Sequence, residues 1–256
     1  MLAADRLRAI VDRVQSHSSV RVVDLAQWFG VSGETIRRDL ELLERDGLIR
    51  RVYGGAVDVQ QHAVRLYRER ELHRMAEKRA IGRLAASLVQ DGDALIIDVG
   101  TTVRAFCDFL GSRRDLTVLT PSLQAAQAIK ATTNARVLVT GGELQDDEAY
   151  LVGPTAEAML AQYYANRAFI SVGGISLDVG LTDFNEAEVQ VRKTILRRAE
   201  QIVVLADSSK LGVRALSVIC GLDKMDILVT DSQIHPDVRA QLEEVGVEVM
   251  VAEEDG

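Results

Sequence analysis

The stretch from residue 22 to residue 57, VVDLAQWFGVSGETIRRDLELLERDGLIRRVYGGAV, contains two short helical patterns separated by a turn. The first pattern ends at Gly30, since glycine readily adopts the left-handed conformation found just past a helix end. Ser32 is suited to cap the second helix by accepting a hydrogen bond from a backbone N–H group. Two helices joined by a turn of this length predict a helix-turn-helix motif.

Apolar periodicity supplies a core for this motif. Upstream of it, apolar residues recur at three- and four-residue spacing and predict a further helix, which carries Leu7, Ile10, Val11 and Val14. In the helix after the turn the same spacing is expected to direct three leucine or isoleucine side chains inward, with Leu48 as a further candidate. These three are Ile36, Leu40 and Leu43.

Polar residues of the second helix cannot share its apolar face. Thr35, Arg37 and Arg38 are therefore expected near the helix N-terminus, the part that enters the DNA major groove in this class of motif. The arginine guanidinium can bind guanine or a phosphate through two hydrogen bonds. Arg37 and Arg38 lie ~100° apart around a helix of ~3.6 residues per turn, which favours one base contact and one phosphate contact, in either order.

After Gly47, the segment LIRRVYGGAV combines strand-forming residues with two arginines and a Gly-Gly turn. This pattern predicts a basic wing that lies along the DNA backbone. An alternative remains open, in which Arg37 pairs with Glu41 and Arg38 with Glu34 on a solvated helix. The residues predicted to contact double-stranded operator DNA are Ser32, Thr35, Arg37, Arg38, Arg50, Arg51, Tyr53, Gly54 and Gly55.

The run SGETIRRDLELLERDGLIRRVYGGAV resembles the N-terminal signature of the DeoR family of bacterial repressors, which typically reads TIRRDL followed by an R-x-x-GG wing. The resemblance implies that residues 35–40 correspond to the recognition-helix motif of the family. It also implies that Arg51, Gly54 and Gly55 lie in its wing.

Length and charge indicate two parts. The chain has 256 residues with 47% apolar content, and its formal net charge is −8. Residues 1–57 carry nine Arg and eight Asp or Glu, a net charge of +1, which leaves −9 for the remainder. An acidic remainder is a poor DNA surface, so DNA binding is expected at the front of the chain. The predicted domains are a winged helix-turn-helix over 1–57, a helical linker over 58–77 and an α/β effector-sensing domain over 78–256.

Other features favour a cytoplasmic protein without cofactor or metal. No opening apolar signal segment occurs, nor an apolar run of ~18–20 residues, so export and a membrane partner are not expected. Cys107 and Cys220 are isolated, lack metal-ligand spacing and are interpreted as buried, reduced thiols.

From residue 81 onward, short β-rich runs alternate with helical stretches. The runs are ALIIDVG, LTVLT, ARVLVTGG, RAFISVGG, QIVVLAD and MDILVTD. This alternation predicts a doubly wound, mostly parallel α/β domain. Ligands of such domains collect at the carboxyl ends of the strands.

The predicted strand ends carry carboxylates, hydroxyls, glycines and one lysine. Carboxylates can hold sugar hydroxyls, whereas Lys, Thr and backbone N–H groups can hold phosphate, so a phosphorylated sugar or polyol fits this set. No nucleotide-binding fingerprint is present. The predicted effector-binding residues are Asp98, Gly100, Thr101, Thr102, Ser122, Gly141, Gly142, Gly173, Gly174, Asp183, Glu186, Glu188, Asp207 and Lys210.

Each strand-end feature also has a purely structural interpretation. The glycines can be turn residues, Asp207 can be a helix cap and Lys210 can be a solvated surface charge. A second class of function is also open: an isomerase-type enzyme, with Asp98, Asp183, Glu186 or Glu188 as a base beside Lys210.

The second part also resembles the DeoR family, whose sensor domain is similar to ribose-5-phosphate isomerase. The family blocks D-x-G-T-T, G-G, G-[LI]-T-x-x-N/E-x-E and D-x-S-K are matched at 98–102, 141–142, 180–188 and 207–210. The resemblance implies a cytoplasmic repressor of a carbohydrate uptake or catabolism operon, modulated by a phosphorylated metabolite. A homo-oligomer, dimer or tetramer, is a separate hypothesis, since paired recognition helices fit paired operator half-sites. The family commonly has T-N-S after its second strand. This chain has Thr120-Pro121-Ser122, so the contact made by that Asn is not carried over.

Overall fold

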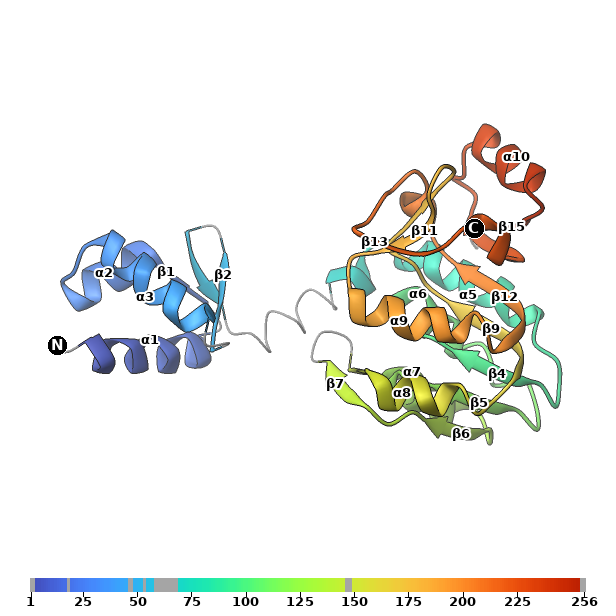
Figure 1. Ribbon diagram of the computed structural model, residues 1–256, viewed down its shortest axis with the longest axis horizontal. Helices are drawn as coiled ribbons and strands as arrows, with labels where there is room; N and C mark the ends of the chain where they lie inside the picture. Colours follow the sequence, from blue (N-terminus) through green and yellow to red (C-terminus); the bar gives the residue numbers. More distant parts are fainter. Residues whose placement is uncertain are drawn as a thin grey trace. The chain divides into compact units, whose positions relative to one another are not determined.

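A computed structural model describes residues 3–17, 19–45, 48–52, 54–57, 69–145 and 149–253. The chain divides into two compact units, Met1–Glu69 and Arg70–Gly256, which are drawn in Figure 1. Of the predicted helical linker over 58–77, residues 58–68 lie outside the described residues, and residues 69–72 are helical.

Within its described residues up to 57, the first unit combines three helices with a small antiparallel sheet of order β1-β3-β2. Its elements are α1 (Ala3–His17), β1 (Ser19–Arg21), α2 (Val22–Phe29), α3 (Gly33–Arg45), β2 (Arg50–Val52) and β3 (Gly55–Val57). Gly30 ends α2 in the left-handed conformation, with φ 65°, and its N–H group donates to the carbonyl of Ala26. The predicted helix-turn-helix with a wing is confirmed.

The core of the first unit follows the apolar periodicity of the sequence. Buried side chains from all three helices meet the wing strand through Ala56. Leu48 departs from the expectation, because it is 47% exposed. Its neighbour Ile49 is 2% exposed and takes the core position, since the chain has left the helix and its side chains no longer follow the helical period.

The second unit contains a seven-stranded sheet in the order β15-β14-β12-β9-β4-β5-β6, and every neighbouring pair is parallel. The strands are β4 (Ala94–Ile97), β5 (Thr117–Thr120), β6 (Arg136–Val139), β9 (Ala165–Ile170), β12 (Ala199–Leu205), β14 (Ile227–Asp231) and β15 (Glu248–Ala252). The predicted doubly wound α/β fold is confirmed, and β15 is a strand that the sequence analysis did not single out.

Helices cover both faces of this sheet (Figure 1). Along β4, Leu95 and Ile97 pack into one apolar cluster and Ile96 into another, as strand alternation requires. The first cluster includes α5 (Met75–Ser87), α6 (Thr101–Cys107) and α7 (Leu123–Thr132), and the second includes α8 (Pro154–Leu160), α9 (Glu186–Ile195) and α10 (Pro236–Glu244).

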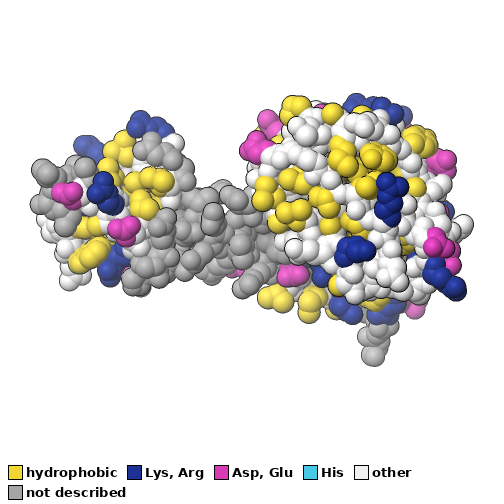
Figure 2. All heavy atoms as spheres, turned by 90° about the horizontal axis from the view of Figure 1, so that it is seen from below, with side chains coloured by type: hydrophobic (Ala, Val, Ile, Leu, Met, Phe, Trp, Pro, Cys, Tyr) yellow, Lys and Arg dark blue, Asp and Glu magenta, His cyan; other side chains and the backbone are white. Residues whose placement is uncertain are grey.

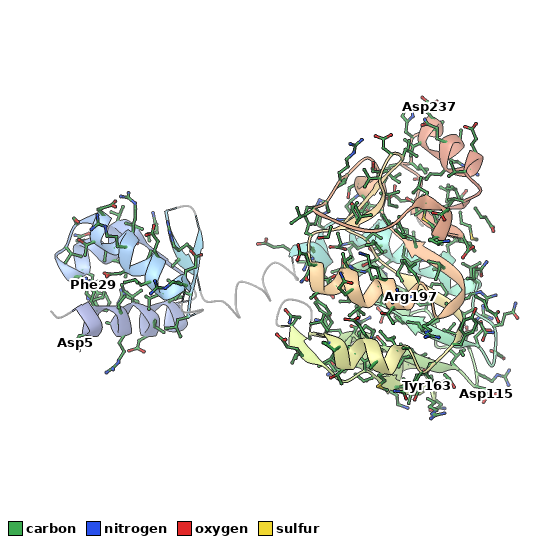
Figure 3. The ribbon with its side chains drawn as sticks, in the orientation of Figure 1. Asp5, Phe29, Asp115, Tyr163, Arg197 and Asp237 are labelled. Atoms are coloured by element: carbon green, nitrogen blue, oxygen red, sulfur yellow. The ribbon has the colours of Figure 1, made fainter. Side chains whose placement is uncertain are left out.

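Smaller elements stand beside the sheet. A hairpin joins β7 (Glu143–Gln145) to β8 (Tyr150–Val152), and a second antiparallel sheet contains β10 (Gly174–Ser176), β11 (Gly180–Asp183) and β13 (Ser217–Cys220). Two 3-10 turns are η1 (Ser208–Lys210) and η2 (Leu222–Lys224). Asp115, Tyr163 and Asp237 lie at the periphery of the unit (Figure 3).

The edge strand β6 borders an apolar groove of about 370 Å³, lined by α7 and β6. Hydrophobic side chains gather on this face of the second unit (Figure 2). No helix in the described part of the chain is both long and apolar enough to cross a membrane.

The order of the strands defines where the chain reverses direction across the sheet. From β4 the chain adds β5 and β6 on one side, and then returns to place β9, β12, β14 and β15 on the other. The switch point therefore lies between β4 and β9. In open parallel sheets, the crevice beyond the carboxyl ends of the two strands at this point is the usual ligand position.

Candidate functional sites

The helix α3 presents its arginines to solvent. Ser32 accepts a hydrogen bond from the backbone N–H of Thr35 at 3.1 Å, as predicted for a cap. The side chains of Arg37 and Arg38 are 58% and 77% exposed, and Glu34 pairs with both, at 3.2 Å and 3.9 Å. Exposed ion pairs of this kind contribute little free energy, so both guanidinium groups can exchange Glu34 for another anion.

The alternative pairing of these arginines is present in part. Arg38 pairs with Glu34, as that alternative proposed, whereas Arg37 pairs with Glu34 rather than with Glu41. Glu41 instead accepts a hydrogen bond from Arg51 of the wing at 2.9 Å. The wing and the recognition helix are thereby held together by a partly exposed ion pair.

Asp39, in the middle of the TIRRDL run, has a different orientation from its neighbours. Arg6 of α1 donates two hydrogen bonds to its carboxylate, at 2.6 Å and 3.1 Å, and the two side chains are 11% and 7% exposed. Asp39 therefore anchors α3 to α1 and does not face the groove-binding side.

The wing is the β2–β3 hairpin. Gly54 has φ 82°, and its carbonyl accepts a hydrogen bond from the N–H of Val22. A Cβ atom at Gly55 would overlap the backbone carbonyl of Val20, so this position admits no side chain without moving β1. Tyr53 and the side chain of Arg50 lie outside the described residues.

The switch point of the sheet carries a hydrogen-bonded junction. Asp98 directly follows β4, and Ser171 directly follows β9. The Ser171 hydroxyl donates to the carbonyl of Val99 at 2.7 Å, and its N–H donates to Asp98 Oδ2 at 3.3 Å. A Cβ atom at Gly100 would overlap the Ser171 hydroxyl, so this glycine is required by the junction itself.

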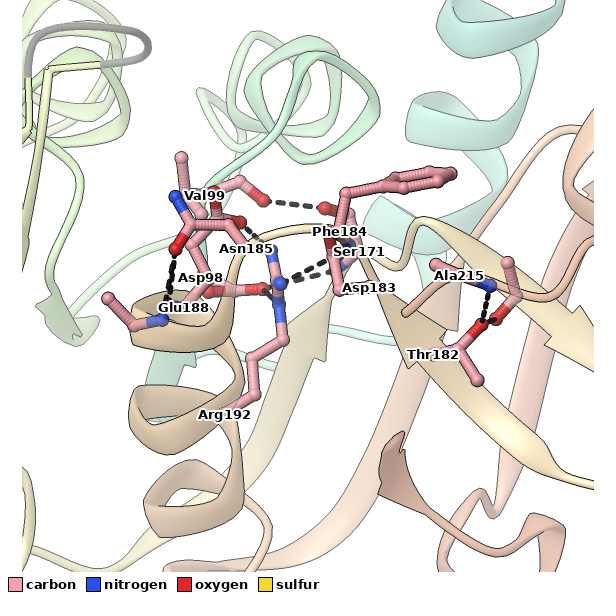
Figure 4. Close-up of polar contacts among 12 residues, drawn as sticks. Asp98, Val99, Ser171, Thr182, Asp183, Phe184, Asn185, Glu188, Arg192 and Ala215 are labelled. Atoms are coloured by element: carbon pink, nitrogen blue, oxygen red, sulfur yellow. Dashed lines mark hydrogen bonds and ion pairs between the residues drawn. The ribbon is translucent and has the colours of Figure 1, made fainter. Parts of the chain in front are cut away.

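A buried arginine, Arg192 of α9, gathers three of the predicted carboxylates (Figure 4). Its Nε donates to Asp98 at 2.6 Å, its Nη1 to Asp183 at 2.8 Å and its Nη2 to Glu188 at 2.8 Å. The side chains of Arg192 and Asp98 are each 1% exposed. Asp183 and Glu188 are slightly more accessible, at 12% and 13%.

The network continues toward the β7–β8 hairpin. Tyr150 donates to Glu188 at 2.7 Å and accepts a hydrogen bond from the Asn185 amide at 2.8 Å. Asn185 also caps α9 by accepting hydrogen bonds from the N–H groups of Ala187 and Glu188. The hairpin, the switch point and α9 are therefore joined by one continuous set of hydrogen bonds.

Three carboxylates around one guanidinium leave an excess of negative charge. Burial raises the pKa of the Asp98 and Glu188 carboxyls, and the attraction of Arg192 only partly opposes this rise. Burial disfavours the charged form of Arg192, but the surrounding carboxylates together raise its pKa well above the ordinary value. The cluster therefore keeps its arginine charged, while the pKa values of Asp98 and Glu188 lie above those of free carboxyls.

A second cluster lies at the carboxyl ends of β12 and β14. Asp207 caps η1, and its Oδ1 accepts hydrogen bonds from the N–H and hydroxyl of Ser209 and from Arg74. Lys210, at the end of this turn, is half-buried, and no carboxylate among the described residues pairs with it. Lys210 was predicted beside Asp98 and its partners, but the cation that contacts them is Arg192.

The other predicted residues occupy the same edge of the sheet with structural partners of their own. Ser122 is buried and caps α7 by accepting from Ala125 at 3.1 Å, and Glu186 is exposed in the first turn of α9, outside the Arg192 network. Thr101 and Thr102 begin α6. Backbone or side-chain atoms of the chain itself fill the space beside Gly141, Gly142, Gly173 and Gly174.

Sequence reasoning missed Arg192, Tyr150, Asn185 and Arg74 as members of these clusters. A signal for Arg192 existed: it stands four residues after Glu188, on a helix face where apolar residues such as Val189 and Ile195 are also buried. A charged residue on a buried face requires a partner. The contacts of Tyr150 depend on tertiary folding, as do those of Arg74 with Asp207 and Gln233. The Arg74–Glu77 pair is local, at i,i+3 spacing.

Comparison with known proteins agrees with this architecture. The model of the DeoR-like helix-turn-helix domain matches residues 6–62, and the model of the DeoR C terminal sensor domain matches residues 73–232. The fold and these matches define the class of protein: a DNA-binding transcriptional regulator with a sensor domain. The chain belongs to the DeoR family, which confirms the resemblance seen in its sequence.

Relatives cover the whole length of the chain. The HTH-type transcriptional regulator YulB of Bacillus subtilis is 39% identical over 97% of this chain and 96% of its own length. The HTH-type transcriptional repressor GlcR of the same organism is 34% identical over 100% and 98%. The HTH-type transcriptional regulator GolR of Listeria innocua is 30% identical over 99% and 100%.

Similarity to solved structures is weaker. Ribose 5-phosphate isomerase A of Methanocaldococcus jannaschii matches with 20% identity over 52% of this chain and 53% of its own, at a TM-score of 0.39. This level of similarity carries no information about activity.

Proposed function

We propose that this regulator is a repressor of a carbohydrate uptake or catabolism operon, and that a phosphorylated sugar or polyol modulates its binding to operator DNA in the cytoplasm. The observation that carries the DNA-binding half of the proposal is the exposed Arg37–Arg38 pair at the start of a capped helix that stands beside a hairpin wing. Such a helix end supplies base and phosphate contacts in winged helix-turn-helix proteins.

The effector half rests on the polar clusters at the carboxyl edge of the sheet. Asp183 and Glu188 keep some exposure beside the switch point and can accept hydrogen bonds from sugar hydroxyls. Lys210, at the end of the η1 turn, offers a positive charge for a phosphate. The effector residues predicted from the sequence remain our proposal for this site.

An isomerase-type activity is disfavoured by the partners of the carboxylates. A general base must be free to take a proton from the substrate, yet Asp98, Asp183 and Glu188 all accept hydrogen bonds from Arg192. Sensing without turnover is the simpler role for this arrangement.

A homo-oligomer, dimer or tetramer, would present paired recognition helices to operator half-sites. If the effector favours a different arrangement of the paired recognition helices, the repressor loses affinity for the operator. Sedimentation velocity of the purified protein, with and without operator DNA, measures the oligomeric state.

The test of the function is a thermal-shift screen with fructose 1-phosphate, fructose 6-phosphate, glucose 6-phosphate, glycerol 3-phosphate and ribose 5-phosphate. Any compound that raises the melting temperature saturably is then added to an operator-binding assay and incubated with the protein to detect isomerisation. We expect stabilisation and weaker operator binding without turnover. Turnover would establish an enzyme instead, and no shift with phosphorylated sugars or polyols would contradict the proposed effector class.

A further inference from the structure

Arg74 lies near the N-terminal start of the sensor unit, which begins at Arg70. It is the residue before α5, and it adopts the left-handed backbone conformation with φ 55°, which is unusual for a residue other than glycine. The described helical segment 69–72 precedes it, on the side of the chain that leads to the DNA-binding unit. Non-glycine residues are held in this conformation when the surrounding contacts determine it.

The side chain of Arg74 supplies such contacts. Its Nε donates to Glu77 at 2.9 Å, its Nη1 to Asp207 at 3.4 Å, and its Nη2 to the side-chain oxygen of Gln233. Asp207 follows β12 and Gln233 follows β14. One arginine therefore joins the start of α5 to two loops at the carboxyl edge of the sheet.

These two loops are also joined to each other. Asp231, fully buried at the end of β14, accepts hydrogen bonds from the N–H of Ser208 at 2.8 Å and from the N–H of Gln233 at 2.9 Å. A displacement of the η1 turn would therefore affect Gln233 as well as Asp207. Both of these residues hold Arg74.

A second contact fixes the same segment. Lys78 is 5% exposed, and its ammonium group donates to the backbone carbonyl of Arg70. The helical segment before Arg74 is thus attached to α5 through Lys78, and α5 is attached to the η1 turn through Arg74. This gives a continuous path from the proposed effector turn to residue 70.

We propose that Arg74 couples the Asp207–Lys210 turn to the segment leading to the DNA-binding unit, so that a ligand engaging this turn releases Arg74 and alters residues 69–74. The coupling rests on the proposed function for its effector. The 3.4 Å contact of Arg74 with Asp207 is longer than its 2.9 Å contact with Glu77. A phosphate bound at the turn competes directly for this guanidinium, because arginine binds phosphate through two hydrogen bonds.

The test uses the full-length protein and operator DNA, with no sugar phosphate present. Arg74→Ala removes the coupling cation, and Asp207→Asn removes the charge while keeping an oxygen that can cap η1. Each single variant should weaken operator binding by about fivefold or more, the lower end of ordinary allosteric coupling. The double variant should be no weaker than the weaker single variant, because both changes break one connection.

Arg167→Ala is the matched control. Arg167 is 19% exposed and pairs with Asp93 at 2.6 Å, but it lies near the start of β9, at the opposite end of the sheet. It should leave operator affinity unchanged. Equal loss in this control would assign the effect to general destabilisation and overturn the coupling.

Amide hydrogen exchange provides a readout that does not depend on DNA. Asp207→Asn should speed exchange in residues 74–80, although the substitution lies 133 positions away from Arg74. Unchanged exchange there, or additive losses in the double variant, would refute the coupling. A failure of all sugar phosphates to bind the wild-type protein would refute the proposed effector class and leave these apo results standing.

Discussion

The Nε atom of Arg192 lies 2.6 Å from Asp98 Oδ2, and the two side chains are each 1% exposed. This pair joins helix α9 to the end of β4, at the switch point of the sheet. Because Asp183 and Glu188 bind the same guanidinium, the position of three carboxylates depends on one cation. The site is therefore organised by one buried arginine, whose Nε, Nη1 and Nη2 atoms each bind a different carboxylate.

Arg192→Met should lower the free energy of unfolding by about 3–5 kcal/mol, since it leaves buried carboxylates without their partner. Urea denaturation followed by far-UV circular dichroism measures this loss. The control is Arg197→Met, two residues after α9, whose exposed side chain bonds to Thr194. That change should stay within about 0.5 kcal/mol, and a similar loss in both variants would contradict the assigned role of Arg192.

Protonation of Glu188 should contribute to the pH dependence of the free energy of unfolding. Burial raises the pKa of this carboxyl, so the folded protein holds the proton to a higher pH than the unfolded chain does. The contribution of Glu188 to the free energy of unfolding should then decrease as pH rises from about 4.3, the ordinary glutamate pKa, through the raised pKa of the folded protein. In a urea series from pH 4 to pH 7, the free energy of unfolding of the wild type minus that of Glu188→Gln should fall as pH rises; a difference that stays constant or grows would disprove the assignment.

The Arg6–Asp39 pair should control the stability of the first unit. Asp39→Leu leaves the largely buried Arg6 without its carboxylate partner and should lower the free energy of unfolding by about 3 kcal/mol. Combining it with Arg6→Met should recover most of this loss, because two apolar side chains leave no unpaired charge. Trp28, the one tryptophan of the chain and a residue of the first unit, allows this unfolding to be followed by fluorescence. No recovery in the double variant would count against the pairing.

Operator binding should depend on Arg37 and Arg38 in separable ways. Each alanine variant should weaken binding, and loss of a phosphate contact should reduce the slope of log affinity against log salt by about 1. Loss of a base contact should instead relax sequence preference by about 1–3 kcal/mol. Arg8→Ala, an exposed arginine on α1, controls for net charge. Unaltered affinity in both variants would remove α3 as the recognition helix.

The two glycines of the wing should respond differently to alanine. Gly54 has φ 82° with open space beside it, so Gly54→Ala should cost about 1 kcal/mol of backbone strain. Gly55→Ala should cost more, because its Cβ atom would meet the backbone of β1. Urea unfolding followed by Trp28 fluorescence measures the stability of the two variants. A larger loss for Gly54→Ala than for Gly55→Ala would show that Gly55 does not pack against the backbone of β1.

Local signals explain how much of this molecule was predictable. The left-handed Gly30, the cap at Ser32 and the apolar period of α3 each depend on neighbours within four residues, and all three are found in the structure. The parallel sheet could equally be predicted from the sequence, since its buried strands are nearly continuous apolar runs. Strand β15 was missed because Glu248 begins it and no turn signal isolates it from the end of the chain.

The interior of the sensor was predictable in composition but not in connectivity. Sequence reasoning placed Asp98, Asp183 and Glu188 at strand ends, but it assigned them to a ligand or to Lys210. Their partner Arg192 lies 94 positions from Asp98, and no periodicity encodes a contact over that distance. Pairing among buried charges is decided by the fold as a whole.

The inward-facing Asp39 shows that the residues of the TIRRDL run have different roles. Asp39 holds α3 to α1 through Arg6 within the DNA-binding unit, whereas positions 35, 37 and 38 are those that we propose contact operator DNA. A library aimed at a new operator can therefore randomise these outward positions while keeping Arg6 and Asp39 constant, so that altered specificity and loss of folding are sampled independently.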